Sequence, residues 1–336
     1  MEIQIFKPHP IIGYTFIPDL KLRVEHEDGG YLLRTNSAGF RSEHEFVERS
    51  TGKRRLLLFG DSFTAGDGVA NKYRYSDLME TLLPDVEVYN FGLPGTGTDQ
   101  HYLVWREIAK RFDHDVVVIA VQVENIRRVA ARYRLSKTAA GEDVLFAKPY
   151  FELTDGELAL HGVPVPPEPL SPDEIEGADR EFVDQGGRHL WLRNFVNKLG
   201  GPVKDLAQRV SGYQPLPEYH DPNGPEWKLM KAILQQWVSE IQTPVIVVPI
   251  PLYHYIEETA APDAYRARFG EIAVFQNVTV HDPLPDYRAL STAERRELRF
   301  RSDIHPTPRH HRLLADSIAA TVRPILKPAR EEATAR

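Results

Sequence analysis

The pattern that most constrains this chain is an alternation of short apolar runs with amphipathic stretches, which begins at Arg54. Runs of nearly uninterrupted apolar, often β-branched residues are typical of strands buried on both faces. We predict such strands at residues 56–59, 86–90, 116–121, 244–250 and 278–280. Strands that alternate with helices join through right-handed crossovers into a parallel sheet, so the pattern predicts an α/β fold.

The regions outside this alternation differ in character. Residues 1–50 carry early prolines and an Asp28-Gly-Gly30 turn signal, so we expect an N-terminal extension that contains a hairpin. From about 135 to 225 the rhythm is lost and prolines are frequent, which indicates an irregular insertion. An insertion of this size usually covers a ligand site, although plain surface decoration is the alternative. We place the main domain at 51–327 and expect a disordered polar tail at 328–336.

Composition excludes several classes of function. The 336 residues are 42% hydrophobic and 26% charged, as in ordinary globular proteins. A net charge of -7 argues against a nucleic-acid partner and against anionic membrane surfaces. The absence of cysteine excludes disulfides, thiolate catalysis and cysteine-ligated zinc. Without a signal-peptide core or a membrane-length apolar run, we expect a cytoplasmic protein with no membrane insertion.

The first predicted strand ends abruptly in Gly60-Asp61-Ser62. Because ligands of open α/β sheets bind at the carboxyl ends of the strands, Ser62 would stand at the mouth of a crevice. The alternative is that Ser62 is the N-cap of a helix. The nucleophile turn G-x-S-x-G does not match, since Thr64 occupies the place of the second glycine. If Ser62 is a nucleophile, its base therefore lies elsewhere in the chain.

Two further stretches follow predicted strands. The loop after residues 86–90 contains Gly92, Gly95 and Gly97, and such a loop can direct backbone N–H groups at an anion. A phosphate cradle is the rival interpretation, but the lysine and hydroxyl residue that complete a P-loop are absent. The strand at 116–121 is followed by Asn125, whose amide could donate to a developing oxyanion or simply form a local turn.

The stretch Asp303-Ile-His305-Pro306 near the end of the chain combines an acid with an imidazole. Alternate side chains of an extended segment share one side, and Pro306 favours that conformation at His305. The Asp303 carboxylate can then accept a hydrogen bond from Nδ1–H of His305 and leave Nε2 facing outward as a base. Alternatives are a chance pairing, or two metal ligands beside His310 and His311, although these lack the spacing of a zinc motif.

Taken together and in this order, the four stretches resemble the SGNH (GDSL) hydrolase superfamily. Gly60-Asp61-Ser62 resembles its first block, Asn90-x-Gly92-x-x-Gly95 its second, Glu124-Asn125 its third, and Asp303-x-His305-Pro306 its fifth. The match spans roughly residues 54–325 and leaves the insertion unmatched. The extension that ends in Asn36-Ser-Ala-Gly-Phe-Arg41 also resembles bacterial branches of the superfamily.

Two blocks depart from the usual pattern. Val123 and Ile126 replace the first and last residues of the usual Gly-x-Asn-Asp third block. The usual fifth block, Asp-x-x-His, would put Ser302 in the place of the acid. Branches that resemble enzymes of polysaccharide O-acetyl chemistry use Asp-x-His instead, so we assign the acid to Asp303.

The resemblance implies a flavodoxin-like three-layer α/β/α sandwich around a central parallel sheet, and ester chemistry without a metal or cofactor. It implies a triad of Ser62, Asp303 and His305, and an oxyanion hole formed by the N–H groups of Ser62 and Gly95 and the amide of Asn125. We expect a serine esterase that removes a short acyl group, as an O-deacetylase does, from a carbohydrate or secondary metabolite through an acyl-serine. The alternatives are an acyltransferase with the same triad and an inactive carbohydrate-binding scaffold.

Overall fold

The computed structural model describes residues 5–27, 29–49, 52–137, 142–171, 173, 175, 183–184 and 213–326. Its centre is a sheet of five parallel strands in the order β14-β13-β7-β5-β6. The strands are β5 (Arg54–Phe59), β6 (Val86–Asn90), β7 (Val116–Gln122), β13 (Val245–Ile250) and β14 (Val278–Val280). Numbered along the chain, the order is 2-1-3-4-5, which is that of flavodoxin-like folds. The predicted α/β class is therefore confirmed.

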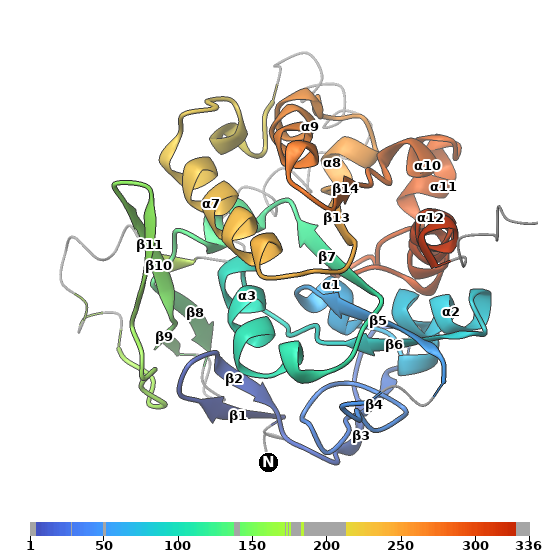
Figure 1. Ribbon diagram of the computed structural model, residues 1–336, viewed down its shortest axis with the longest axis horizontal. Coiled ribbons are helices and arrows are strands. Elements are labelled where there is room, and N and C mark those ends of the chain that lie inside the picture. The colour runs from blue at the N-terminus through green and yellow to red at the C-terminus, as the bar shows by residue number, and fades with distance from the viewer. Residues whose placement is uncertain are drawn as a thin grey trace, which may run out of the picture.

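Helices cover both faces of this sheet (Figure 1). On one side α2 (Tyr75–Leu82) packs against α12 (Pro308–Leu326), and on the other α3 (Thr98–Glu107) packs against α7 (Pro225–Ser239). Every residue of β7 and β13 is buried, as expected for strands enclosed between two helical layers. The arrangement is the predicted three-layer α/β/α sandwich.

Shorter helices complete the connections. The α-helices are α1 (Ser62–Ala65), α4 (Asn125–Arg128), α8 (Tyr253–Ile256), α9 (Asp263–Gly270), α10 (Leu284–Arg288) and α11 (Thr292–Arg296). The 3₁₀ turns are η1 (Asn71–Tyr73), η2 (Ala109–Arg111), η5 (Pro217–Tyr219) and η6 (Glu271–Val274). Across the described ranges, every helix is too short or too polar to cross a bilayer.

The N-terminal extension forms two antiparallel hairpins. The first joins β1 (Phe6–His9) to β2 (Gly13–Phe16), and the second joins β3 (Lys21–Val24) to β4 (Tyr31–Arg34). Arg41, which follows the second hairpin, is fully buried and donates hydrogen bonds to the carbonyls of Gly66 and Val69. The extension is therefore attached to the segment that follows α1.

The first part of the insertion is more regular than predicted. It contains β8 (Tyr133–Lys137) paired with β9 (Asp143–Ala147), and β10 (Tyr150–Thr154) paired with β11 (Glu157–His161). The short β12 (Val183–Asp184) adds to β8. Asp155 and Gly156 turn the second hairpin with φ values of 53° and 87°, which is the Asp-Gly turn signal that sequence analysis overlooked.

The insertion is anchored to the main domain by a buried ion pair. Nζ of Lys148 lies 2.5 Å from Oδ2 of Asp99 at the start of α3, and β10 packs against α3 and α7. Most of the insertion between 176 and 212, and the predicted tail at 328–336, lie outside the described residues.

Candidate active site

Ser62 is the first residue of α1, directly after β5. The N-cap of this short helix is Asp61, whose carboxylate accepts a hydrogen bond from the backbone N–H of Phe63 at 3.0 Å. The interpretation of Ser62 as a capping residue is therefore wrong, because its neighbour fills that position. Ser62 is 6% exposed, and its hydroxyl has no hydrogen-bond partner among the described residues. Gly60 permits this sharp turn, since a Cβ there would overlap Thr64.

Asn125 stands at the end of the neighbouring strand. It opens α4 after β7, which pairs with β5 at the point where the strand order reverses. Its Nδ2 donates to Oδ2 of Asp61 at 3.0 Å and to the carbonyl of Gln122 at 2.9 Å, so the amide ties the two strand ends together. Both amide hydrogens have acceptors in this arrangement. The oxyanion role of Asn125 stays a prediction that requires one of these bonds to open.

The glycine loop after β6 lies beside α1. A Cβ at Gly92 would come within 2.5 Å of the backbone nitrogen of Ala65, so only glycine allows this close approach. Gly95 has a left-handed φ of 71°. The backbone N–H groups of Ser62 and Gly95 have no acceptor within the described part of the chain. These two donors are therefore available to an added acceptor, and their role in an oxyanion hole stays a prediction.

The Asp303 and His305 pair forms as predicted. Nδ1 of His305 donates to Oδ1 of Asp303 at 2.6 Å, and the backbone N–H of His305 donates to the same oxygen at 3.1 Å. The imidazole packs against the ring of Phe63, with centroids 5.8 Å apart, and its Nε2 lies 4.0 Å from Oδ2 of Asp67. Phe63 lies within α1 and Asp67 follows shortly after it, so the structure brings His305 beside the helix that begins with Ser62.

Electrostatics favour the charged form of this histidine. Burial alone would lower the pKa of His305, but the hydrogen bond to Asp303 and the charge of Asp67 outweigh it and raise the pKa above 6.5. Burial would raise the pKa of Asp303, yet the hydrogen bonds from His305 and His26 hold it well below its usual range. Burial raises the pKa of Asp67 itself. The carboxylates around His305 therefore suit a histidine that becomes an imidazolium when it acts as a base.

Replacing Asp67 tests this electrostatic account. Ester cleavage would require a neutral His305, so kcat/KM should rise with pH through the pKa of His305. The Asp67→Asn substitution removes a carboxylate that lies 4.0 Å from Nε2 of His305 and should lower the pKa of this histidine. The rising part of the pH profile, its acid limb, should therefore move to lower pH by about one unit. The pH dependence of hydrolysis of an activated acetyl ester measures the shift. Asp316→Asn, on the exposed side of α12, is the control and should leave the limb in place.

Sequence analysis missed two arginines at the site. Arg128 donates from Nη1 to Oδ2 of Asp61 and to the carbonyl of Thr96, each at 3.1 Å. Arg134 lies over the ring of Tyr14, and a Cβ at Gly95 would come within 2.7 Å of its Nη1. Arg128 follows Asn125 by one helical turn, a spacing that could have suggested a shared surface. Arg134 belongs to the insertion, where no local signal pointed to the site.

His310 and His311 serve the core. Nε2 of His310 lies 2.9 Å from the hydroxyl of Tyr287, and Nδ1 of His311 accepts from the backbone N–H of Tyr75 at 3.3 Å. In the described ranges, no group of three or more acidic, cysteine or histidine side chains is placed to hold a metal ion.

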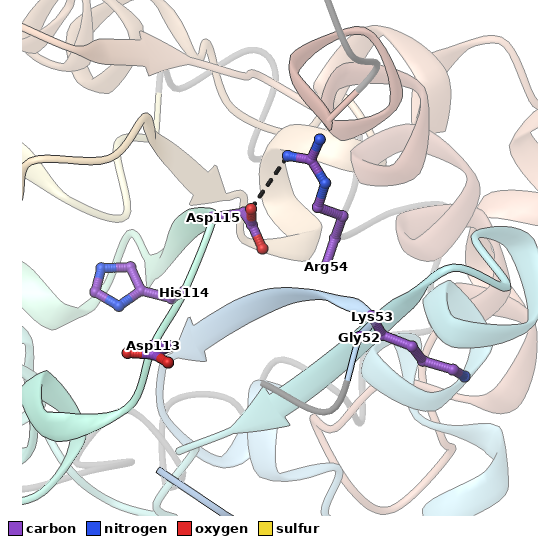
Figure 2. Close-up of a pocket in the computed structure, with 6 residues that line it drawn as sticks. All are labelled: Gly52, Lys53, Arg54, Asp113, His114 and Asp115. Atoms are coloured by element: carbon purple, nitrogen blue, oxygen red, sulfur yellow. Dashed lines mark hydrogen bonds and ion pairs between the residues drawn. The ribbon is translucent and has the colours of Figure 1, made fainter. Parts of the chain in front are cut away.

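A pocket of about 330 Å³ lies at the other end of the strands, where β5 and β7 begin (Figure 2). It is lined by Gly52, Lys53, Arg54, Asp113, His114 and Asp115, which lie just before or at the start of β5 and just before β7. Nη1 of Arg54 forms an ion pair with Oδ1 of Asp115 at 3.1 Å (Figure 2). Because parallel sheets bind ligands at the carboxyl ends of their strands, this amino-terminal pocket is not the candidate active site.

No protein-family model matches the chain, and no curated protein matches it. Solved structures of similar shape include a lipase/acylhydrolase from Enterococcus faecalis, 16% identical over 82% of this chain and 98% of that chain, with a TM-score of 0.43. A lipolytic protein of the G-D-S-L family from Veillonella parvula is 13% identical over 80% and 98%, with a TM-score of 0.40. An acetyl xylan esterase, AlAXEase, is 14% identical over 80% and 99%, with a TM-score of 0.43. Likeness this distant does not assign an activity to the chain.

Proposed function

We propose that this chain is a carboxylic ester hydrolase with Ser62 as nucleophile, His305 as general base and Asp303 as the acid that orients it. The observation that carries the proposal is the position of the His305 imidazole. It is held by Asp303 at 2.6 Å and contacts Phe63 within α1 and Asp67 shortly after this helix. The free N–H groups of Ser62 and Gly95 at the same edge of the sheet complete the set of groups that acyl transfer needs.

The reaction follows from these positions. His305 takes the proton of the Ser62 hydroxyl at Nε2 as Oγ attacks the ester carbonyl, and Asp303 stabilises the imidazolium. The oxyanion of the tetrahedral intermediate receives the N–H groups of Ser62 and Gly95. As the intermediate collapses, the imidazolium protonates the departing alcohol and leaves an acyl-Ser62 ester. Water, deprotonated by His305, then attacks this ester, and the acid is released as Ser62 regains its proton.

The enclosure of Ser62 supports a short acyl group. With 6% of its surface exposed and the ring of Phe63 beside it, the serine favours an acetyl group over a long chain. Several aromatic residues that could have stacked on a sugar, Tyr219, Trp227 and Tyr255, are instead buried in the core. A carbohydrate or secondary-metabolite O-acetyl ester, suggested by the Asp-x-His block, is the substrate class we propose.

Covalent labelling tests the proposal. A fluorophosphonate should modify the folded protein at one site, and peptide mass analysis should locate the adduct on Ser62, because only an activated serine reacts. A panel of activated esters should then show faster hydrolysis of acetyl than of longer acyl groups. Heat-denatured protein is the control and should remain unlabelled. A folded protein without an adduct on Ser62 would support the inactive scaffold instead, and acyl transfer to an added alcohol in preference to water would support an acyltransferase.

A further inference from the structure

The turn between β3 and β4, in the N-terminal extension, contacts the loop that carries the acid and the base. Nε2 of His26 lies 3.1 Å from Oδ2 of Asp303. The carboxylate of the next residue, Glu27, accepts the backbone N–H groups of Arg301 at 2.5 Å and Ser302 at 2.7 Å, and it also accepts the Ser302 hydroxyl. Two consecutive residues near one end of the chain therefore hold the loop near its other end.

Packing fixes the ring of His26. It stands edge-on against Phe300, with centroids 4.4 Å apart, and its side chain is 12% exposed. Gly68, one residue after Asp67, has a φ of 88°, and a Cβ there would come within 2.7 Å of Phe300 and 3.4 Å of His26. The absence of a side chain at Gly68 lets this ring pair close against the segment that follows α1.

The hydrogen-bond pattern assigns a direction to the contact. An ionised carboxylate only accepts, so Nε2 of His26 carries the hydrogen and donates it to Asp303. Nδ1 of His26 is buried and has no partner among the described residues, which fits the tautomer without a hydrogen at that nitrogen. The two bonds from His305 both go to Oδ1 of Asp303, whereas Oδ2 receives the bond from His26. The Asp303 carboxylate is thus held between two imidazoles.

We propose that His26 is a positioning residue of the active site, which fixes Oδ2 of Asp303 so that Oδ1 stays on Nδ1 of His305. The inference rests on the proposed function, since it concerns the orientation of its general base. Asp303 is 29% exposed, so without His26 its carboxylate would be free to rotate and exchange this bond for water. His26 acts through Asp303 and does not contact the nucleophile.

Loss of His26 has two consequences. Looser orientation of His305 lowers kcat, by about 10-fold as is typical when an outer partner of a functional residue is removed, while KM stays the same. In addition, the donated hydrogen draws charge from the Asp303 carboxylate. Without this bond the carboxylate attracts the His305 proton more strongly, and the acid limb of kcat/KM moves to higher pH.

The other groups near this pair remain unchanged in the experiment. Among the described residues, the titratable side chains that interact with His26, Asp303 or His305 include Asp61 and Asp67 around α1, Glu27 and Tyr31 in the hairpin, Tyr253 on α8 and His311 on α12. A shift that follows substitution of His26 alone therefore reports on the bond from His26 to Asp303.

The test compares His26→Leu with His26→Gln. Leucine removes the donor, whereas the glutamine amide keeps an N–H group with similar reach, so kcat and the acid limb should change in the first variant and return close to wild type in the second. His44→Leu is the matched control, because His44 also lies in the extension and pairs with a carboxylate, Glu80 at 3.0 Å, away from Asp303. If His26→Leu melts early, His26→Asn, too short to reach Asp303, takes its place with the same expected result.

Wild-type kcat and an unmoved acid limb in His26→Leu or His26→Asn would overturn the inference, as would equal losses in the leucine and glutamine variants at unchanged melting temperature. These results leave the proposed function standing as long as Ser62 of the wild type takes the fluorophosphonate. If Ser62 of the wild-type protein is not labelled, the proposed function itself is wrong, whatever the His26 variants show. The two failures are therefore distinguishable.

Discussion

Replacing Ser62 with alanine should lower kcat for an activated acetyl ester by about 10⁶, the loss seen when the nucleophile of a serine hydrolase is removed. The Oγ atom forms the bond that divides the reaction into acylation and deacylation, and alanine has no atom that replaces it. The hydroxyl makes no hydrogen bond with the described residues, so the melting temperature should stay close to that of the wild type. Steady-state kinetics and differential scanning calorimetry measure the two effects.

The control for this variant is Ser239→Ala. Ser239 ends α7 and is exposed, and its hydroxyl donates only to the carbonyl of Gln236 in the described structure. This substitution should leave kcat unchanged. If Ser62→Ala turns over the ester at the wild-type rate, another group is the nucleophile and the proposed mechanism is wrong.

Replacing Arg41 with methionine should lower the free energy of unfolding by about 3 to 5 kcal/mol, since several buried acceptors lose their donor at once. Arg41 is 0% exposed and donates to the carbonyls of Gly66 and Val69 at 2.6 and 2.7 Å and to Oδ1 of Asn71 at 2.9 Å. Methionine fills similar space without any N–H group. Since Asp67 and Gly68 lie within the segment that Arg41 holds, kcat should fall as well.

The midpoint of urea unfolding measures this loss of stability. Arg34→Met is the matched control, because Arg34 lies in the same extension but is 44% exposed and pairs at the surface with Glu43. Surface ion pairs contribute little, so the control should change the free energy of unfolding by less than about 1 kcal/mol. Equal losses in the two variants would show that the buried hydrogen bonds of Arg41 do not account for the effect.

The parts of the fold that were predicted from sequence are those with a local cause. Strands β5, β7 and β13 were predicted because burial on both faces demands uninterrupted apolar runs. β5 begins two residues before its predicted start, at Arg54, because Arg55 is buried against Glu87, with Nη2 and Oε1 2.6 Å apart. A local pattern does not reveal that a charged residue continues a strand when its partner lies on a neighbouring strand.

The candidate site divides in the same way. Asp303 and His305 were paired from their spacing, because two residues in an extended segment determine each other's geometry. His26 and Asp67 were not identified, since each reaches the Asp303–His305 pair only through tertiary packing. His26, for example, is separated from Asp303 by 277 positions in the sequence. The N-cap at Asp61 was also missed, although aspartate and serine are comparable caps and the sequence places them side by side.

The hydrogen bonds that join the β3–β4 turn to the loop before α12 have a consequence for biosynthesis. His26 and Glu27 are synthesised before Ser62, whereas the residues that they hold, Arg301, Ser302 and Asp303, follow much later, with 277 positions between His26 and Asp303. The sheet strands and Ser62 are already synthesised by then, but the nascent chain still lacks His305, the general base of the proposed mechanism. Under the proposed function, esterase activity should therefore require synthesis through His305, and polypeptides that end before this residue should be inert toward esters.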